Sequence, residues 1–148
     1  MDMVFHKLPC SILSLDVQDI MGSHSVNVEG TLVKNNVDKG GNIIGKFEEP
    51  KEKFARTNSS PGHNNMVVQP DIDAVRAQLK REDGCQIFGS ISILKVPGNF
   101  HISSHAFAQT LGRLASEGAY NFDLTHTVNH ISFGNEDDIR NIKKIFNT

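Results

Sequence analysis

Residues 84–89 read GCQIFG and residues 95–101 read KVPGNFH, and these two stretches decide the predicted fold. Between them, Ser90–Ile93 alternates small polar with β-branched residues, which is typical of a half-buried strand. Pro97–Gly98 ends that strand, because proline has no backbone N–H to donate and glycine provides the φ that a turn can need. The extended pattern resumes at Asn99–Ile102. We therefore expect a buried strand with a hairpin or corner at its exit, and no catalytic loop.

Short alternating segments recur along the chain. Ser11–Val17 places leucine and valine on one face and polar side chains on the other, which predicts a strand with one wet side. Val26–Glu29 predicts a second strand, and Asp38–Asn42 a tight turn that leads into an apolar pair. A further strand is expected at Thr127–Phe133. Many short strands between turn signals favour an antiparallel sandwich.

The remaining segments predict two helices and one irregular insertion in a single domain of residues 1–148. Asp71–Arg81 has apolar residues at helical spacing behind a capping aspartate, and Asp137–Phe146 is a possible terminal helix. Residues 48–69 are polar and show no period over more than twenty positions, which predicts a mobile insertion.

Composition excludes several classes of protein. The chain has 148 residues and a net charge of −2, with no long basic run, so we expect no nucleic acid partner. No stretch approaches the ~18 consecutive apolar residues of a membrane-spanning helix. Residues 1–4 show no apolar signal-peptide region. These features alone would indicate a cytosolic protein.

The histidines raise the question of a metal site. His101 with His105, and His126 with His130, share the i, i+4 spacing that chelates zinc when it lies on a helix. Both pairs are expected in extended segments, where these positions lie about 13 Å apart. We therefore predict hydrogen-bonded or surface histidines, with no metal and no other cofactor.

Catalytic residues are not expected either. An apolar strand around Cys85 disfavours the thiolate that a cysteine nucleophile requires. The acidic run at residues 135–138 lacks the ligand spacing of a calcium loop, and we expect it to stabilise the start of the helix that follows.

Four segments in order resemble the luminal domain of the ER–Golgi intermediate compartment family, the paired vesicle proteins that cycle between these organelles. The ordered matches run from Pro9 to Phe146, with little resemblance between Phe47 and Glu82, and look most similar to the smaller, cysteine-poor branch. The motif residues, in chain order, are Asp16, Asp19, Gly22; Gly84, Gly89; Lys95, Gly98, Asn99, Phe100, His101; Thr125, His126, Ser132, Phe133 and Gly134.

The resemblance implies an all-β, antiparallel sandwich-like luminal domain with one or two short helices. It also implies a disulfide that joins Cys10, in the first strand, to Cys85. From the residues alone, two separate buried thiols are equally compatible with the sequence. Asn58 lies in an Asn-Ser-Ser sequon, where a luminal protein would be accessible to glycosylation.

Two departures from the family pattern follow. The cysteine cluster of the larger partner is absent, and the family domain continues beyond the position that matches Gly134 into further strands and a membrane helix. We therefore expect a soluble fragment of a membrane-spanning protein, shortened at its C-terminus, whose open sheet edge allows self-association.

The function implied is non-catalytic. We expect the luminal side of a protein of the ER, intermediate compartment and Golgi membranes, acting in vesicular transport or cargo retrieval. The expected partners are cargo proteins and a related family subunit. The alternative is an independent luminal or secreted sandwich that binds carbohydrate or protein, and a histidine–metal hydrolase is a third class.

Overall fold

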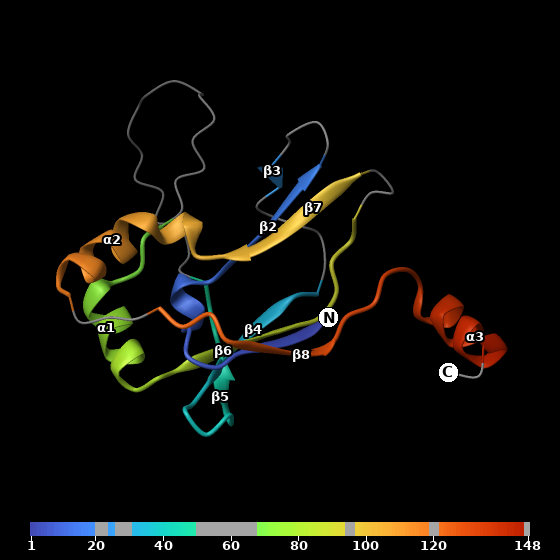
Figure 1. The fold of residues 1–148 in the computed structure, drawn as a ribbon, viewed down its shortest axis with the longest axis horizontal. Helices are drawn as coiled ribbons and strands as arrows, with labels where there is room; N and C mark the ends of the chain where they lie inside the picture. The colour runs from blue at the N-terminus through green and yellow to red at the C-terminus, as the bar shows by residue number, and fades with distance from the viewer. Residues whose placement is uncertain (20–23, 26–30, 50–67, 94–96, 119–121, 147–148) are drawn as a thin grey trace.

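The computed structural model describes residues 1–19, 24–25, 31–49, 68–93, 97–118 and 122–146, and its strands form two antiparallel sheets. In Figure 1 the three-stranded sheet lies above the five-stranded sheet. The five-stranded sheet has the order β5 (Ile43–Lys46), β4 (Val33–Val37), β6 (Gly84–Phe88), β1 (Asp2–Phe5), β8 (His126–His130). The three-stranded sheet has the order β3 (His24–Ser25), β2 (Ser14–Asp19), β7 (Gly98–Ser103). The predicted β-rich, antiparallel class is confirmed.

Helices lie beyond both ends of the sheets (Figure 1). The helices α1 (Ile72–Lys80) and α2 (Ala108–Ser116) pack together at one end, and α3 (Glu136–Phe146) stands beyond the other (Figure 1). Two 3-10 turns, η1 (Cys10–Ile12) and η2 (His105–Phe107), join the strands to these ends.

The core lies on one face of the five-stranded sheet. Side chains alternate between the two faces along each strand, and the register places the buried ones of neighbouring strands opposite each other. On β1, Met3 and Phe5 are buried, and they pair with Ile87 and Cys85 of β6. Opposite residues of an antiparallel pair share a face, so these four side chains point the same way. The buried cluster comprises Met3, Phe5, Leu8, Cys10, Ile12, Leu13, Val75, Cys85, Ile87, Phe107 and Leu114.

The exit from β6 differs from the sequence prediction. Only Ile91 within Ser90–Ile93 forms a bridge, so the strand predicted there is wrong. Gly89 has a φ of 130° and donates its N–H to the carbonyl of Met1, while Thr31 donates to the carbonyl of Ser90. These two contacts extend the pairing of β6 with β1 and β4 by one or two residues, and the regular strand ends before Gly89, whose φ is positive. Because β7 lies in the other sheet, the segment is a corner between sheets rather than a hairpin.

The helix predictions at both positions are confirmed. Asp71 accepts a hydrogen bond from the N–H of Asp73 at 3.2 Å and caps α1, and α3 covers the expected terminal segment. The helix α2 was not predicted, although Phe107, Thr110 and Leu114 are buried at helical spacing.

Several predictions fall outside the described residues. They are the strand at residues 26–29, the sequon residue Asn58, most of the insertion at residues 48–69, and the motif residues Gly22 and Lys95.

Candidate functional site

The disulfide anchors the first motif. Cys10 and Cys85 are fully buried and bonded, with Cα atoms 4.9 Å apart. This is the pairing that the resemblance implies. Its location differs in one respect, because Cys10 lies in the turn η1 and not in a strand. The bond joins the turn that precedes β2, in the three-stranded sheet, to β6, the central strand of the five-stranded sheet.

The two glycines around Cys85 are required by close backbone packing. A Cβ atom at Gly84 would collide with the carbonyl oxygen of Phe5, and one at Gly89 with that of Thr31. The positive φ of Gly89 adds a second cost for any side chain. The Gly-Cys motif therefore maintains the fold and is not available to bind a partner.

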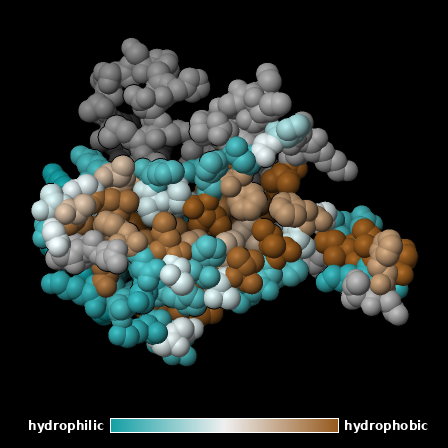
Figure 2. All heavy atoms as spheres, in the orientation of Figure 1, coloured by the Kyte–Doolittle hydropathy of each residue, from teal (hydrophilic) through white to brown (hydrophobic). Residues whose placement is uncertain are grey.

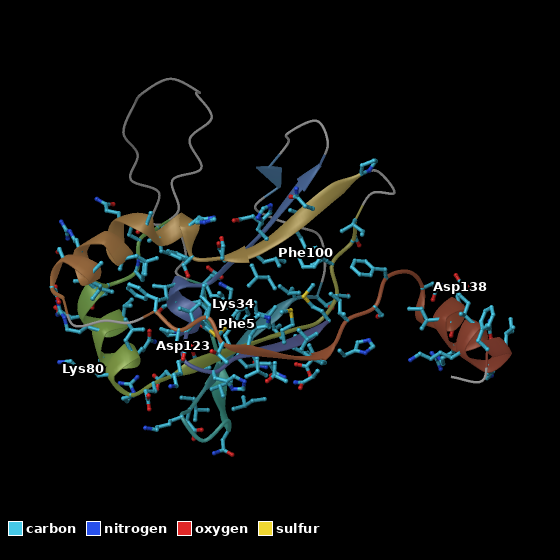
Figure 3. The ribbon with its side chains drawn as sticks, viewed as in Figure 1. Phe5, Lys34, Lys80, Phe100, Asp123 and Asp138 are labelled. Carbon is cyan, nitrogen blue, oxygen red and sulfur yellow. A yellow bond between two sulfur atoms is a disulfide. The ribbon has the colours of Figure 1, made fainter. Side chains whose placement is uncertain are left out.

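Two other motif segments, about 80 residues apart in the sequence, lie side by side. Strands β2 and β7 pair in register, with Asp16 opposite His101, Val17 opposite Phe100, and Asp19 opposite Gly98. Figure 3 shows Phe100 on the side of β7 that faces the five-stranded sheet. Asp16 and His101 point the other way, because side chains alternate along a strand.

The outward side of this strand pair is a polar surface, which we call the motif face: Ser14, Asp16, Asn99, His101 and Ser103. The imidazole Nε2 of His101 lies 2.8 Å from the Asn99 side-chain oxygen, and the Ser14 hydroxyl donates to Asp16 at 3.4 Å. Asn99 and His101 are exposed, and Asp16 is half-buried. These polar side chains are accessible to a partner.

Lys34 holds the two sheets together beneath this face. Its side chain shares the face of Ile87, the residue opposite it on β6, and is only 11% exposed. The ammonium donates to the carbonyl of Leu13 at 2.6 Å and to Glu49 at 2.5 Å, and it lies 5.3 Å from the ring centroid of Phe47 (Figure 3). A nearly buried lysine needs such partners, because its charge loses water.

The last motif segment lies away from the motif face, on the five-stranded sheet. Thr125 accepts from the N–H of His6, and the His126 ring lies 5.2 Å from that of Phe5. Ser132 bonds to His130 at 3.1 Å, and Phe133 is 65% exposed. Gly134 has a φ of 98° in the turn before α3. The motifs thus form two surfaces and a packing element, not one site.

The histidine pairs do not converge. His101 lies in β7, but His105 begins the turn η2, so the prediction that this pair is extended is wrong. His126 and His130 both lie in β8, as predicted. Among the described residues, no group of three or more histidine, cysteine or acidic side chains is placed to hold a metal ion.

The run at residues 135–138 forms the start of α3, with Asn135 before the helix and the acids in its first turn. The side-chain oxygen of Asn135 accepts from the N–H of Asp137 at 3.1 Å, and the Asn135 carbonyl accepts from Ile139. Asn135 is therefore the cap, while Asp137 pairs with Arg140. The prediction that the acidic residues cap the helix is therefore wrong, because the capping group is an amide and the acids lie within the first turn of α3.

Residues 48–145 match the family described as "Endoplasmic reticulum vesicle transporter". The chain belongs to this family. The match includes residues 48–82, where the motifs alone gave little resemblance, and it contains the motif segments from Gly84 onward. It leaves out Asp16–Asp19, so the pairing of β2 with β7 joins a matched segment to one outside the match.

Relatives of this vesicle transporter family cover nearly all of the chain. The probable ER–Golgi intermediate compartment protein 3 of Dictyostelium discoideum is 26% identical, over 92% of this chain and 48% of its own length. The intermediate compartment protein 1 of Xenopus laevis is 29% identical, over 95% and 31%. The ER-derived vesicles protein ERV46 of Saccharomyces cerevisiae is 23% identical, over 90% and 46%. The chain thus spans between about a third and a half of these relatives.

The alignments with these relatives differ in length. The frog alignment takes 142 positions, whereas those with the Dictyostelium and yeast proteins take 183 and 190 for a slightly smaller share of this chain. The longer alignments therefore contain many positions that this chain lacks. No solved structure matches the chain.

Family membership gives the cellular setting. Vesicle transporters of this family act between the ER and the Golgi, at the membranes of the ER, the intermediate compartment and the Golgi. None of the helices in the described ranges is long and apolar enough to cross a membrane.

Proposed function

We propose that this chain is a non-catalytic recognition domain on the luminal side of an ER–Golgi transport protein. Its motif face contacts a partner protein, which is a related family subunit or a cargo protein. The observation that carries the proposal is the pairing of β2 with β7, which gathers polar residues of two distant motif segments on one accessible surface. Exposed polar residues within a family motif are more consistent with binding than with packing.

The disulfide supports the luminal side. Both cysteines are consumed in one buried bond, and structural disulfides persist in oxidising compartments such as the ER lumen. The same bond leaves neither thiol free to act as a nucleophile, which supports a binding role over a catalytic one.

The geometry of the motif face fits recognition of a protein surface. Asp16 accepts hydrogen bonds, Asn99 both donates and accepts, and the ring of His101 offers one of each when neutral. These groups stand on a rigid antiparallel strand pair, and rigid elements present polar contacts without a large ordering cost.

The test is a paired-variant capture experiment in cells. The native protein is tagged and co-expressed with a tagged related family member, and the amount of that subunit and of other captured proteins is measured by quantitative mass spectrometry. Asp16→Ala with His101→Ala should reduce capture at least fivefold. Lys80→Ala is the matched control, since Lys80 is exposed on α1, away from the motif face (Figure 3).

Fold must be monitored in parallel. The Asp16→Ala, His101→Ala double variant and the Lys80→Ala control should both leave the melting temperature unchanged within a few degrees, because none of the three side chains belongs to the buried core. Unchanged capture by the double variant, with normal folding, would refute the motif face as the recognition surface.

A further inference from the structure

The strand β8 is an outer strand of the five-stranded sheet, and among the usual protections of a sheet edge it has one register shift against β1, at Asn129. Within the described residues it pairs with β1 on one side and with no strand on the other. In natural proteins, a charged side chain (often lysine) or a proline on the edge strand prevents unwanted pairing with another chain. Residues 124–134 contain no lysine, arginine, acid or proline. The opposite edge, β5, ends in Lys46 and is followed by two glutamates and a proline.

Apolar side chains surround this open edge. Figure 2 shows hydrophobic residues on α3 and on the part of the body next to it. Seven apolar side chains in β8, its flanks and α3 are between 44% and 75% exposed: Leu124, Val128, Ile131, Phe133, Ile142, Ile145 and Phe146. At about 100 Å² of exposed surface each, they provide on the order of 700 Å². A standard protein interface buries about 800 Å² per partner.

We propose that the occupant of this edge is a second copy of the chain, paired antiparallel through β8 about a two-fold axis. Residues 126–130 read His-Thr-Val-Asn-His, which has nearly the same order in both directions. Pairing centred on Val128 places valine opposite valine and Thr127 opposite the partner's Asn129. Hydroxyl and amide groups can form a cross-strand hydrogen bond. The same register places His126 opposite the partner's His130, so two imidazole rings meet at each end of the pair, and no lysine, arginine or acid does. This interface is separate from the motif face, so it goes beyond the proposed function.

The same arrangement gives α3 a place to pack. In an antiparallel pair, the end of one β8 lies beside the start of the other. Five residues separate β8 from α3, and five extended residues span up to about 17 Å. The apolar side of α3 can therefore reach the partner's Leu124, which is exposed at the start of β8.

The charges of α3 favour this direction. Asp137 and Asp138 lie in its first turn, and Lys143 and Lys144 in its last. The last turn of α3 then approaches the partner's Asp123, the residue before Leu124. The side-chain hydrogen bond from Thr125 and its backbone N–H, with Lys7 nearby, lower the pKa of Asp123, so that this group is an anion near neutral pH.

The experiment measures the oligomeric state of the whole chain by analytical ultracentrifugation at pH 7.5. We expect the unmodified chain to form dimers at tens of micromolar. Asn129→Lys places a charge on the exposed edge without touching the core and should raise the dimer dissociation constant at least tenfold. Ile43→Lys makes a similar change at the opposite edge, on β5, and should leave that constant unchanged.

Hydrogen exchange of the β8 amides identifies what covers them. Protection that rises with protein concentration, and is lost in Asn129→Lys, supports pairing with a second copy. A monomer at 100 μM would overturn the proposal, as would protection that does not vary with concentration or equal weakening by both lysine variants.

Discussion

Loss of the Cys10–Cys85 bond should remove a large part of the stability of this domain. The bond joins residues separated by 75 positions in the sequence. The chain-entropy model gives a loop of this size a stabilisation of about 4.5 kcal/mol. Because small domains are stable by only about 5–15 kcal/mol, the reduced protein would lose a third or more of its free energy of unfolding. For a chain of this length, that loss corresponds to a fall in melting temperature of roughly 9–18 °C.

Urea unfolding at pH 7, with and without a phosphine reductant, measures this loss. The double variant Cys10→Ala with Cys85→Ala should resemble the reduced parent, and the reductant should not change it further. Both sulfur atoms are fully buried, so the variant also loses some packing and should be slightly less stable than the reduced parent. Thiol titration under denaturing conditions establishes that two thiols are free after reduction. A reduced parent with two free thiols and an unchanged melting temperature would refute the reasoning.

Three further predictions concern local structure. Gly84→Ala should destabilise the protein by about 1–3 kcal/mol in urea unfolding, since its Cβ meets the backbone of β1. Gly112→Ala, in α2 with open space around it, should be neutral or stabilise by up to about 1 kcal/mol and serves as its control. Asp71→Ala should cost about 1 kcal/mol through loss of the α1 cap, whereas equal stability would deny the cap a role. N–H groups of the β4–β5 turn, with that of Asn42 first, lower the pKa of Asp38. Its contribution to the hairpin is therefore present above pH 3.8 and is lost as the pH falls through its lower folded pKa. The protection of β5 amides, relative to their intrinsic exchange rates, should fall over that range in the parent but not in Asp38→Asn.

Local periodicity predicted the elements whose pattern is set by their own neighbours. The alternation in Ser11–Val17 appears as β2, with Leu15 and Val17 on the inner side and Asp16 on the outer. The tight turn at Asp38–Asn42 appears between β4 and β5, where the Asn42 N–H donates to Asp38. The turn rests on contacts within a few residues, and the alternation of β2 records which of its faces is buried, so a sequence pattern contains both.

Other features depend on distant contacts and could not be read from the pattern. The alternation in Ser90–Ile93 predicted a strand, but the regular strand ends before Gly89, where a φ of 130° and the close backbone of Thr31 require glycine. A period of two identifies the face of a strand and not its partner, so the register of β2 with β7 was not predicted.

The helix α2 shows the opposite failure. Its buried positions, Phe107, Thr110 and Leu114, have helical spacing, but a threonine in the buried row and Gly112 inside the helix weaken the apolar signal. Thr110 is tolerated there because its hydroxyl donates to Gln69 at 3.0 Å. That partner lies 41 residues away in the sequence, so only the fold reveals why a polar residue can be buried at this position.

The position of each motif in the fold separates structural from recognition roles. Gly84 and Cys85 are buried and leave no room for change, so their substitution should reduce stability first and binding only as a consequence. Asn99 and His101 are exposed, and their hydrogen bond joins neighbours on one strand, so the fold does not depend on them. A variant at His101 that loses capture while keeping its melting temperature would therefore identify a binding residue. A Gly84 variant that loses both capture and thermal stability would identify a packing residue. Capture and melting temperature measured together therefore distinguish binding residues from packing residues, which the sequence motif alone does not.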